Sequence, residues 1–246
     1  MGFSPPSGDY AIENSASNQV NIQSVMKLVY MWMGFGLLTT TVVAFLIANN
    51  QTLLEFTLNP VFRIVAFIGT FGLVIALSLG MTRNWMTPNL AMLLFFVYSA
   101  VMGVLLSVVA VMATTPETAP AVTSAFLSTV VLFGTMSIFG FTTNMDLTKW
   151  GTYAFMGLIG LILVMVLNIF LQSSGLAFLI SIIGVIIFTV LTAYDTQKIK
   201  EMSESYEIQS DGNLAVKMSI LGALTLYLDF INLFLFLLQI FMGGRD

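Results

Sequence analysis

The stretch from Ala223 to Phe241, ALTLYLDFINLFLFLLQIF, is long and apolar enough to cross a bilayer, yet it carries one carboxylate, Asp229. A membrane-spanning helix needs about 20 mostly apolar residues, and an ionised acid at the bilayer centre costs roughly 2.5–3.5 kcal/mol or more. At helical spacing Thr225, Asp229 and Asn232 share one side of this segment. The stretch therefore predicts a membrane helix whose polar side faces a bundle interior or a water cavity. Alternatively, the polar residues on this side of the helix only form hydrogen bonds to neighbouring helices.

The rest of the chain has the same apolar character. Hydrophobic residues make up 58% of the 246 residues, charged residues make up 8%, and the mean hydropathy is +0.96. This composition predicts an all-α integral membrane protein with seven transmembrane helices in one domain. The expected spans are about 28–48, 61–81, 90–112, 122–141, 150–171, 176–194 and 218–242. Residues 1–26 are polar and are expected to form a disordered N-terminal tail.

The residue types that are missing narrow the possible chemistry. The sequence has no cysteine and no histidine, which removes thiol nucleophiles, imidazole bases and the usual zinc sites. We expect no enzyme activity and no cofactor. Eight Lys and Arg against twelve Asp and Glu, with no basic run, give no basis for nucleic-acid binding. The expected partners are the lipid bilayer, Ca²⁺, protons and another membrane protein.

The basic residues predict the orientation in the membrane. With seven spans, two basic residues fall on the C-terminal side, Arg63 and Arg245. Six fall on the N-terminal side: Lys27, Arg83, Lys149, Lys198, Lys200 and Lys217. By the positive-inside rule the N-terminus is expected in the cytoplasm and the C-terminus outside.

A second carboxylate, Asp195, lies at the end of the predicted sixth span. In the predicted topology both Asp195 and Asp229 are accessible from the cytoplasmic side. If the two come within hydrogen-bonding distance, they cannot both ionise cheaply and would share a proton, which would make the pair a pH sensor. The sequence leaves that distance open. The two carboxylates are also candidate Ca²⁺ ligands, with Thr192, Thr196, Thr225 and Asn232 as supporting polar residues, although Ca²⁺ prefers six to eight oxygens. Arg83 could pair with Asp195 or serve only as a positive-inside anchor.

Two segments around these acids resemble the signature of the Bax inhibitor family of transmembrane proteins, in its bacterial branch. They are Leu191–Met202, LTAYDTQKIKEM, and Ala223–Phe241. Further similarity runs through Tyr30–Ala44 and Phe133–Gly151. The resemblance implies a seven-helix bundle whose C-terminal helix is central and wrapped by the other six, in a bacterial inner membrane.

For the site, the resemblance implies that Asp195 and Asp229 form a di-aspartyl pH sensor of a Ca²⁺ leak, and that Arg83 is similar to a basic residue that latches onto the sixth-span aspartate. Members with that latch also have an acid in the second span, where this chain has Gly69, Gly72 and Ser78.

Three functions are compatible with these residues. The first is a pH-regulated, Ca²⁺-permeable leak channel. The second is a non-transporting modulator of other membrane proteins, such as a membrane-bound protease, in which the acids would be structural. The third is a proton-coupled carrier of a small solute, with Asp229 as the proton site.

Overall fold

The computed structural model describes residues 22–83, 85–205, 208 and 211–243, and within those ranges every regular element is a helix. Residues 1–21 of the predicted tail lie outside the described residues, and the first described helix already begins at Ile22. Seven helices are long and apolar enough to cross a membrane, which confirms the predicted architecture. These are α2 (Ile22–Ala48), α4 (Pro60–Thr82), α5 (Pro88–Leu105), α7 (Ala119–Thr142), α8 (Thr148–Leu171), α9 (Ser174–Ser203) and α11 (Gly212–Gly243).

Local sequence explains where several helices begin. Pro60 and Pro88 occupy the first turns of α4 and α5, where a missing N–H costs nothing. The side chain of Asn59 accepts hydrogen bonds from the backbone N–H of Val61 and Phe62 at 3.0 and 3.3 Å, and so caps α4. These caps fix the short connections between spans.

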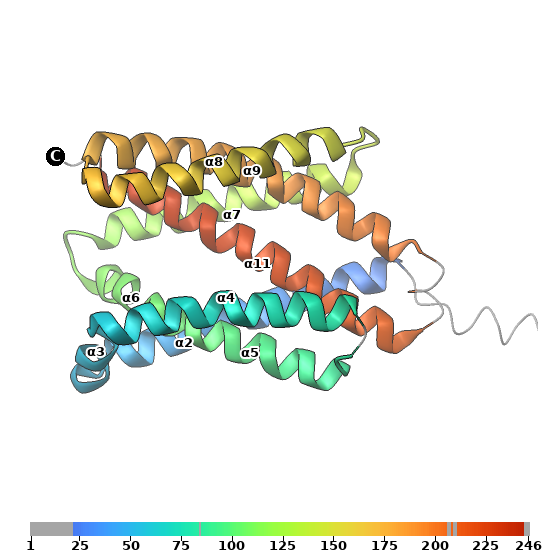
Figure 1. The fold of residues 1–246 in the computed structure, drawn as a ribbon, viewed down its shortest axis with the longest axis horizontal. Helices are drawn as coiled ribbons and strands as arrows, with labels where there is room; N and C mark the ends of the chain where they lie inside the picture. The colour runs from blue at the N-terminus through green and yellow to red at the C-terminus, as the bar shows by residue number, and fades with distance from the viewer. Residues whose placement is uncertain (1–21, 84, 206–207, 209–210, 244–246) are drawn as a thin grey trace, which may run out of the picture.

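The predicted third span, 90–112, is two helices in the structure. α5 ends at Leu105, and the short helix α6 (Ser107–Thr114) continues in a new direction (Figure 1). At the break, the buried Ser107 hydroxyl donates to the carbonyl of Val104 at 2.8 Å. A serine that bonds back to its own helix competes with the backbone ladder and bends the helix.

Three other boundaries differ from the sequence expectation. The predicted loop between the first two spans contains the helix α3 (Gln51–Leu58), capped by Asn50. The sixth span continues beyond Tyr194 to Ser203, and the seventh begins at Gly212 instead of Met218. With 30 and 32 residues, α9 and α11 are therefore longer than the roughly 20 residues that a bilayer span requires, and their extensions lie at the same end of the bundle (Figure 1).

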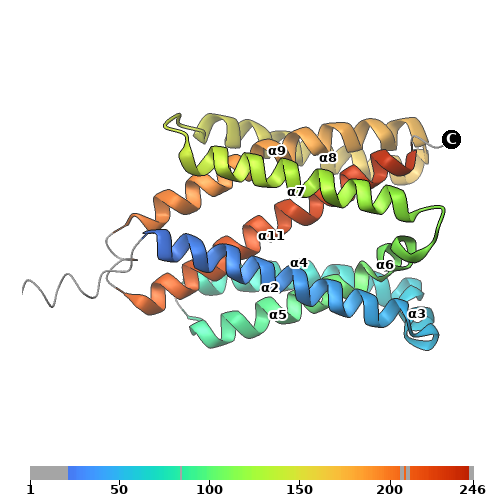
Figure 2. The same ribbon diagram turned by 180° about the vertical axis from the view of Figure 1, so that it is seen from behind.

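The C-terminal helix α11 lies in the middle of the bundle. In its most apolar window 72% of the residues are buried, against 6% in α8. It packs against α9, α2, α7, α5 and α4, while α8 packs on α9. Figures 1 and 2 show α11 crossing obliquely between a group formed by α2, α4 and α5 and a group formed by α7, α8 and α9.

Glycines set the closest helix contacts. A Cβ on Gly140 of α7 would overlap the backbone carbonyl of Ala193 on α9, and a Cβ on Gly151 of α8 would overlap the ring of Tyr194. By contrast, Gly134 of α7 has no such neighbour within 4 Å. The two closest of these glycine contacts therefore lie on the segment of α9 that immediately precedes Asp195.

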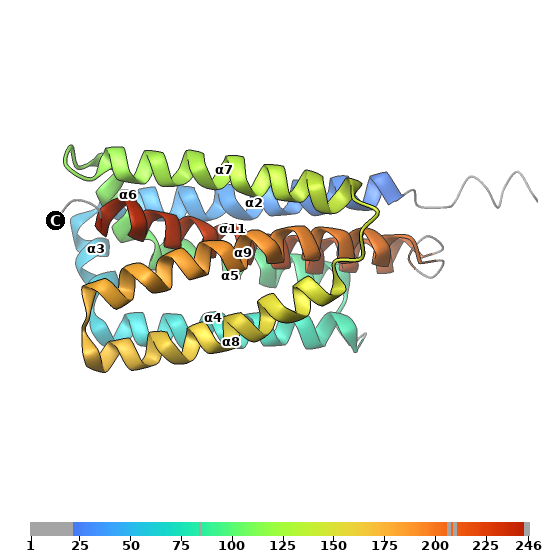
Figure 3. The ribbon, with the colours of Figure 1, turned by 90° about the horizontal axis from the view of Figure 1, so that it is seen from above.

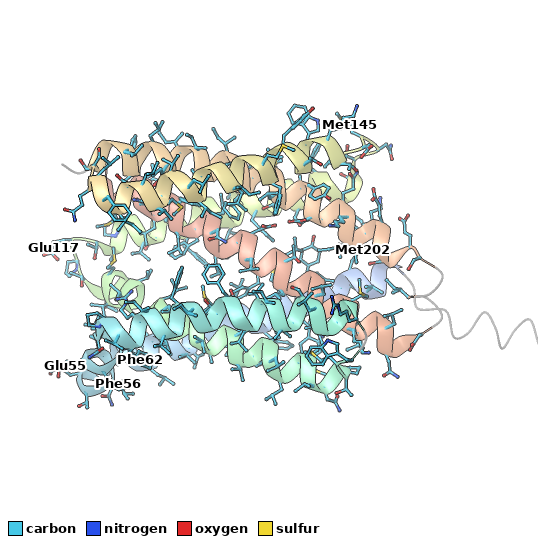
Figure 4. The ribbon with its side chains drawn as sticks, in the orientation of Figure 1. Glu55, Phe56, Phe62, Glu117, Met145 and Met202 are labelled. Atoms are coloured by element: carbon cyan, nitrogen blue, oxygen red, sulfur yellow. The ribbon has the colours of Figure 1, made fainter. Side chains whose placement is uncertain are left out.

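The two ends of the bundle carry different segments. Figure 4 places Met145 and Met202 at one end and Glu55 and Glu117 at the other. The first end also holds the start of α2 and α11 and the end of α9 (Figure 1). Lys27, Lys149, Lys198, Lys200 and Lys217 belong to these segments, as the topology predicted from the sequence requires.

Candidate functional site

Asp195 of α9 and Asp229 of α11 meet between their two helices. Their carboxyl groups lie close enough for a side-chain hydrogen bond to each other. The continuation of α9 beyond Tyr194 and the oblique course of α11 (Figure 1) bring together two positions that straight, shorter helices would hold at different depths. A hydrogen bond between two carboxyl groups requires a proton on one of them, so two carboxyl groups this close favour one shared proton over two charges.

The two acids differ in their access to solvent. Asp229 is 4% exposed, and its Oδ2 atom has no hydrogen-bond partner among the described residues. Asp195 is half-buried and lines a cavity of about 350 Å³. A buried polar atom without a partner is costly, so Asp229 Oδ2 is a position for a proton, a water molecule or a cation.

The cavity beside Asp195 opens at the end of the bundle marked by Met202 in Figure 4. Its walls come from α9 and α11, and its polar lining residues are Asp195, Lys198, Ser203 and Thr225. The charge of Lys198, three residues further along α9, acts on Asp195. The cavity thus leads from one end of the bundle to Asp195, with Asp229 behind it.

Beyond Asp229 the core is closed by aromatic packing. Phe230 contacts Phe133 of α7 with ring centroids 5.4 Å apart. Phe236 contacts Phe188 of α9 at 5.8 Å and fills the space above Gly184. The carboxyl pair therefore lies between a cavity on one side and an apolar, well-packed layer on the other.

A hydroxyl cluster holds α11 on the side opposite α9. The Thr40 hydroxyl lies 2.6 Å from the hydroxyl of Tyr227, 2.9 Å from the Ser99 carbonyl and 3.0 Å from the Gly36 carbonyl. Because Thr40 has one proton to give to a carbonyl, Tyr227 donates to Thr40. This contact joins α2, α5 and α11 two residues before Asp229.

A second cluster holds α9. The Ser137 hydroxyl of α7 bonds the hydroxyl of Tyr30 on α2 and lies 3.1 Å from that of Thr196. Thr196 donates in turn to the Thr192 carbonyl at 2.7 Å. The Thr192 hydroxyl donates within α9, to the carbonyl of Phe188 at 2.7 Å. Ser137 thus links Thr196, the neighbour of Asp195, to α7 and through Tyr30 to α2.

Gln197 fixes the loop between α7 and α8. Its amide nitrogen donates to the carbonyl of Met145 at 2.7 Å, and its amide oxygen accepts from the N–H of Leu147 at 2.9 Å. The sequence analysis did not single out Gln197 or Tyr227. Gln197 stands among other polar residues, from Asp195 to Lys200, so nothing in the sequence around it set it apart.

The other predicted site residues lie apart from the carboxyl pair or bond to their own helix. Arg83 is exposed at the end of α4, and within the described part of the chain it forms no ion pair with Asp195. Thr225 lines the cavity and donates to the Leu221 carbonyl at 3.1 Å. Asn232 donates to the Leu228 carbonyl at 2.8 Å.

The donor set for a metal is therefore two carboxylates. No group of three or more acidic, His or Cys side chains gathers anywhere in the described ranges. Two carboxylates and a hydroxyl fall short of the six to eight oxygens of a tight Ca²⁺ site, and water or carbonyls would have to supply the rest. Such a site suits a cation that binds weakly and leaves.

Seven spanning helices that bring a buried and a half-buried carboxyl group together define a polytopic membrane protein with a polar site inside its bundle. The family model described as inhibitor of apoptosis-promoting Bax1 matches residues 22–246, and the chain belongs to this Bax inhibitor family.

Bacterial relatives share nearly the whole length of the chain. The inner membrane protein YbhL of Escherichia coli K12 is 44% identical over 229 residues, which is 92% of this chain and 94% of that protein. A protein of Borreliella burgdorferi is 43% identical over 218 residues, covering 88% of this chain and 90% of its own length. A protein of Rickettsia prowazekii is 37% identical over 224 residues, covering 91% of each.

Proposed function

We propose that this protein is a Ca²⁺-permeable leak of a bacterial inner membrane whose conductance is set by protonation of the Asp195–Asp229 pair. The observation that carries the proposal is the contact between the two carboxyl groups, one at a cavity and the other buried with an unpartnered oxygen. The inner membrane location rests on the printed name of the Escherichia coli relative. The proposed activity is transport and needs no catalytic residue.

The proposed switch follows from the chemistry of two touching carboxyl groups. With one proton the pair is hydrogen-bonded and holds α9 against α11. When that proton leaves, two like charges repel each other in a poorly solvated site, and a divalent cation becomes the favourable replacement. Protons and Ca²⁺ then compete for the same oxygens, so acidification is expected to reduce Ca²⁺ occupancy and flux.

The proposed orientation places the cavity in the cytoplasm. Lys149, Lys198 and Lys200 lie on helix ends at the same end of the bundle as the cavity, and Arg63 lies in the first turn of α4 at the other end. By the positive-inside rule the N-terminus and the cavity mouth face the cytoplasm and the C-terminus faces outward. Cytoplasmic pH would then act on the pair.

The test is Ca²⁺ flux into proteoliposomes over a range of pH. Wild-type protein is expected to give flux that falls on acidification, and Asp195→Asn and Asp229→Asn are expected to remove the pH dependence. Asp146→Asn is the matched control, because Asp146 is an exposed acid in the loop between α7 and α8. Flux no greater than that of empty vesicles, or equal pH dependence in all three variants, would refute the proposal.

A proton-coupled carrier of a small solute is the second candidate, and the cavity favours it. A volume of about 350 Å³ lies within the roughly 300–1,000 Å³ of small-molecule sites. Solute-dependent proton uptake by the same vesicles, abolished by Asp229→Asn, would support a carrier over a leak. If the vesicles show no Ca²⁺ flux and no proton uptake, and another membrane protein co-purifies with this one, the role of a modulator is favoured.

A further inference from the structure

A second cavity, of about 230 Å³, lies on the outside of the bundle and has no residue in common with the cavity at Asp195. Figure 3 shows α7 and α8 on opposite sides of α9, and the cavity lies where these three helices meet the loop that joins α7 to α8. Every residue that lines it is apolar or aromatic: Met136, Phe139, Met145, Leu147, Trp150, Val190 and Ala193.

This outer cavity is built from fixed parts. Its roof is the loop that Gln197 holds through the carbonyl of Met145 and the N–H of Leu147. Its two walls are anchored where Gly140 of α7 and Gly151 of α8 pack against α9. A space with its roof and walls fixed in this way exists before any ligand arrives, which lowers the cost of binding.

The mouth of the outer cavity faces the surroundings of the bundle. Met145, Trp150 and Phe139 are 58%, 57% and 41% exposed. A tryptophan at the end of a spanning helix is typical of the membrane–water interface. An apolar cavity of about 150 Å³ stays dry and accepts a molecule the size of benzene, so the larger space here is suited to part of a lipid acyl chain.

The rim of the outer cavity is basic. Lys149 is exposed in the first turn of α8, next to Trp150. Lys200 lies on α9, and its ammonium group is 3.0 Å from the carbonyl of Phe141 on α7. Asp146 in the roof is the one acid of segment 142–150, so Lys149 and Lys200 together with this carboxylate give the rim a net charge of +1. This balance complements a phosphate headgroup.

We propose that the outer cavity binds one acyl chain of an anionic phospholipid from the adjacent leaflet, whose phosphate is held at the rim by Lys149. The apolar walls select a hydrocarbon chain, and the lysines select a negative headgroup. The bound lipid would rest on Val190 and Ala193, which precede Asp195 on the same helix by five and two residues.

Native mass spectrometry of the full chain, released from nanodiscs of mixed phosphatidylglycerol and phosphatidylcholine, tests this proposal. The wild-type protein is expected to retain one phosphatidylglycerol. Val190→Phe fills the cavity and is expected to reduce retention about tenfold. Ile186→Phe is the matched control, because Ile186 is 60% exposed on the same helix and does not line the cavity. Equal retention by wild type and Val190→Phe, or equal loss in both phenylalanine variants, would overturn the proposal.

The headgroup contact has its own variant pair, which carries little risk to folding. Lys149→Gln removes an exposed cation from the rim and is expected to lower the preference for phosphatidylglycerol over phosphatidylcholine about fivefold. Lys27→Gln removes an exposed cation from α2 at the same end of the bundle and should leave that preference unchanged. An unchanged preference in Lys149→Gln would show that the bound lipid is not selected at this rim. These readouts require no ion flux.

Discussion

Gly140 lies where α7 comes closest to α9, and replacing it with alanine should destabilise the protein measurably. The added Cβ would overlap the carbonyl oxygen of Ala193, a backbone atom that cannot rotate out of the way. Gly134, on the same helix, has no heavy atom of another part of the chain within 4 Å of the equivalent position. Gly134→Ala is therefore the matched control for the same chemical change.

The expected magnitudes follow from two effects. Alanine gains about 0.8–1.0 kcal/mol over glycine in a helix interior, and this gain applies to both variants. Overpacking costs about 1–3 kcal/mol, and the rigid obstacle at Gly140 places the cost near the upper value. The net change is then a loss of about 2 kcal/mol for Gly140→Ala and a gain of about 1 kcal/mol for Gly134→Ala.

Thermal unfolding of the purified protein in detergent measures the difference. At roughly 2–4 °C per kcal/mol for a chain of this length, Tm should fall by about 4–8 °C in Gly140→Ala and rise by about 2–4 °C in Gly134→Ala. Because Ala193 precedes Asp195 by less than one helical turn, the first variant should also change the pH dependence of Ca²⁺ flux. Equal Tm shifts in the two variants would refute the reasoning, since the close contact would then have no energetic consequence.

Three further perturbations test individual contacts. Gln197→Leu should speed amide hydrogen exchange in the loop between α7 and α8, whereas Gln239→Leu, at an exposed amide of α11, should not. Thr40→Val should cost about 1 kcal/mol in unfolding free energy because it leaves the buried Tyr227 hydroxyl without its acceptor, and adding Tyr227→Phe should restore part of that loss. Thr148, the first residue of α8, donates hydrogen bonds to Asp146 that hold the pKa of this carboxyl below its usual range. The ionised Asp146 therefore stabilises the fold at neutral pH, and this contribution is lost as the pH falls through the lowered pKa. Asp146→Asn should accordingly show a smaller drop in Tm than the wild type on acidification to about pH 3.

The apolar runs of the sequence were sufficient to predict the membrane architecture. Each apolar run had to cross the bilayer as a helix. The run with an acid near its centre had to be enclosed by the other helices, and α11 is packed in the middle of the bundle in this way. The acids themselves were also visible, because a carboxylate is conspicuous in such a composition.

Their contact could not be predicted, because it depends on how far α9 continues and how α11 is inclined. The sequence around Tyr194 becomes polar, which indicated the end of a span, but a helix that leaves the bilayer can continue in water to Ser203. The role of Gln197 was hidden for a similar reason, since its partners are backbone atoms about 50 residues away. Pairings of this kind arise from tertiary packing.

The two hydrogen bonds of Gln197 couple any rotation of α9 to the loop between α7 and α8. An amide that donates to one backbone group and accepts from another constrains orientation as well as distance, so α9 cannot turn about its axis without carrying the loop at Met145. Met145 is 58% exposed, whereas Asp229 is 4% exposed. A spin label at position 145 would therefore report from the surface of the bundle on rotations at a carboxyl group that solvent barely reaches.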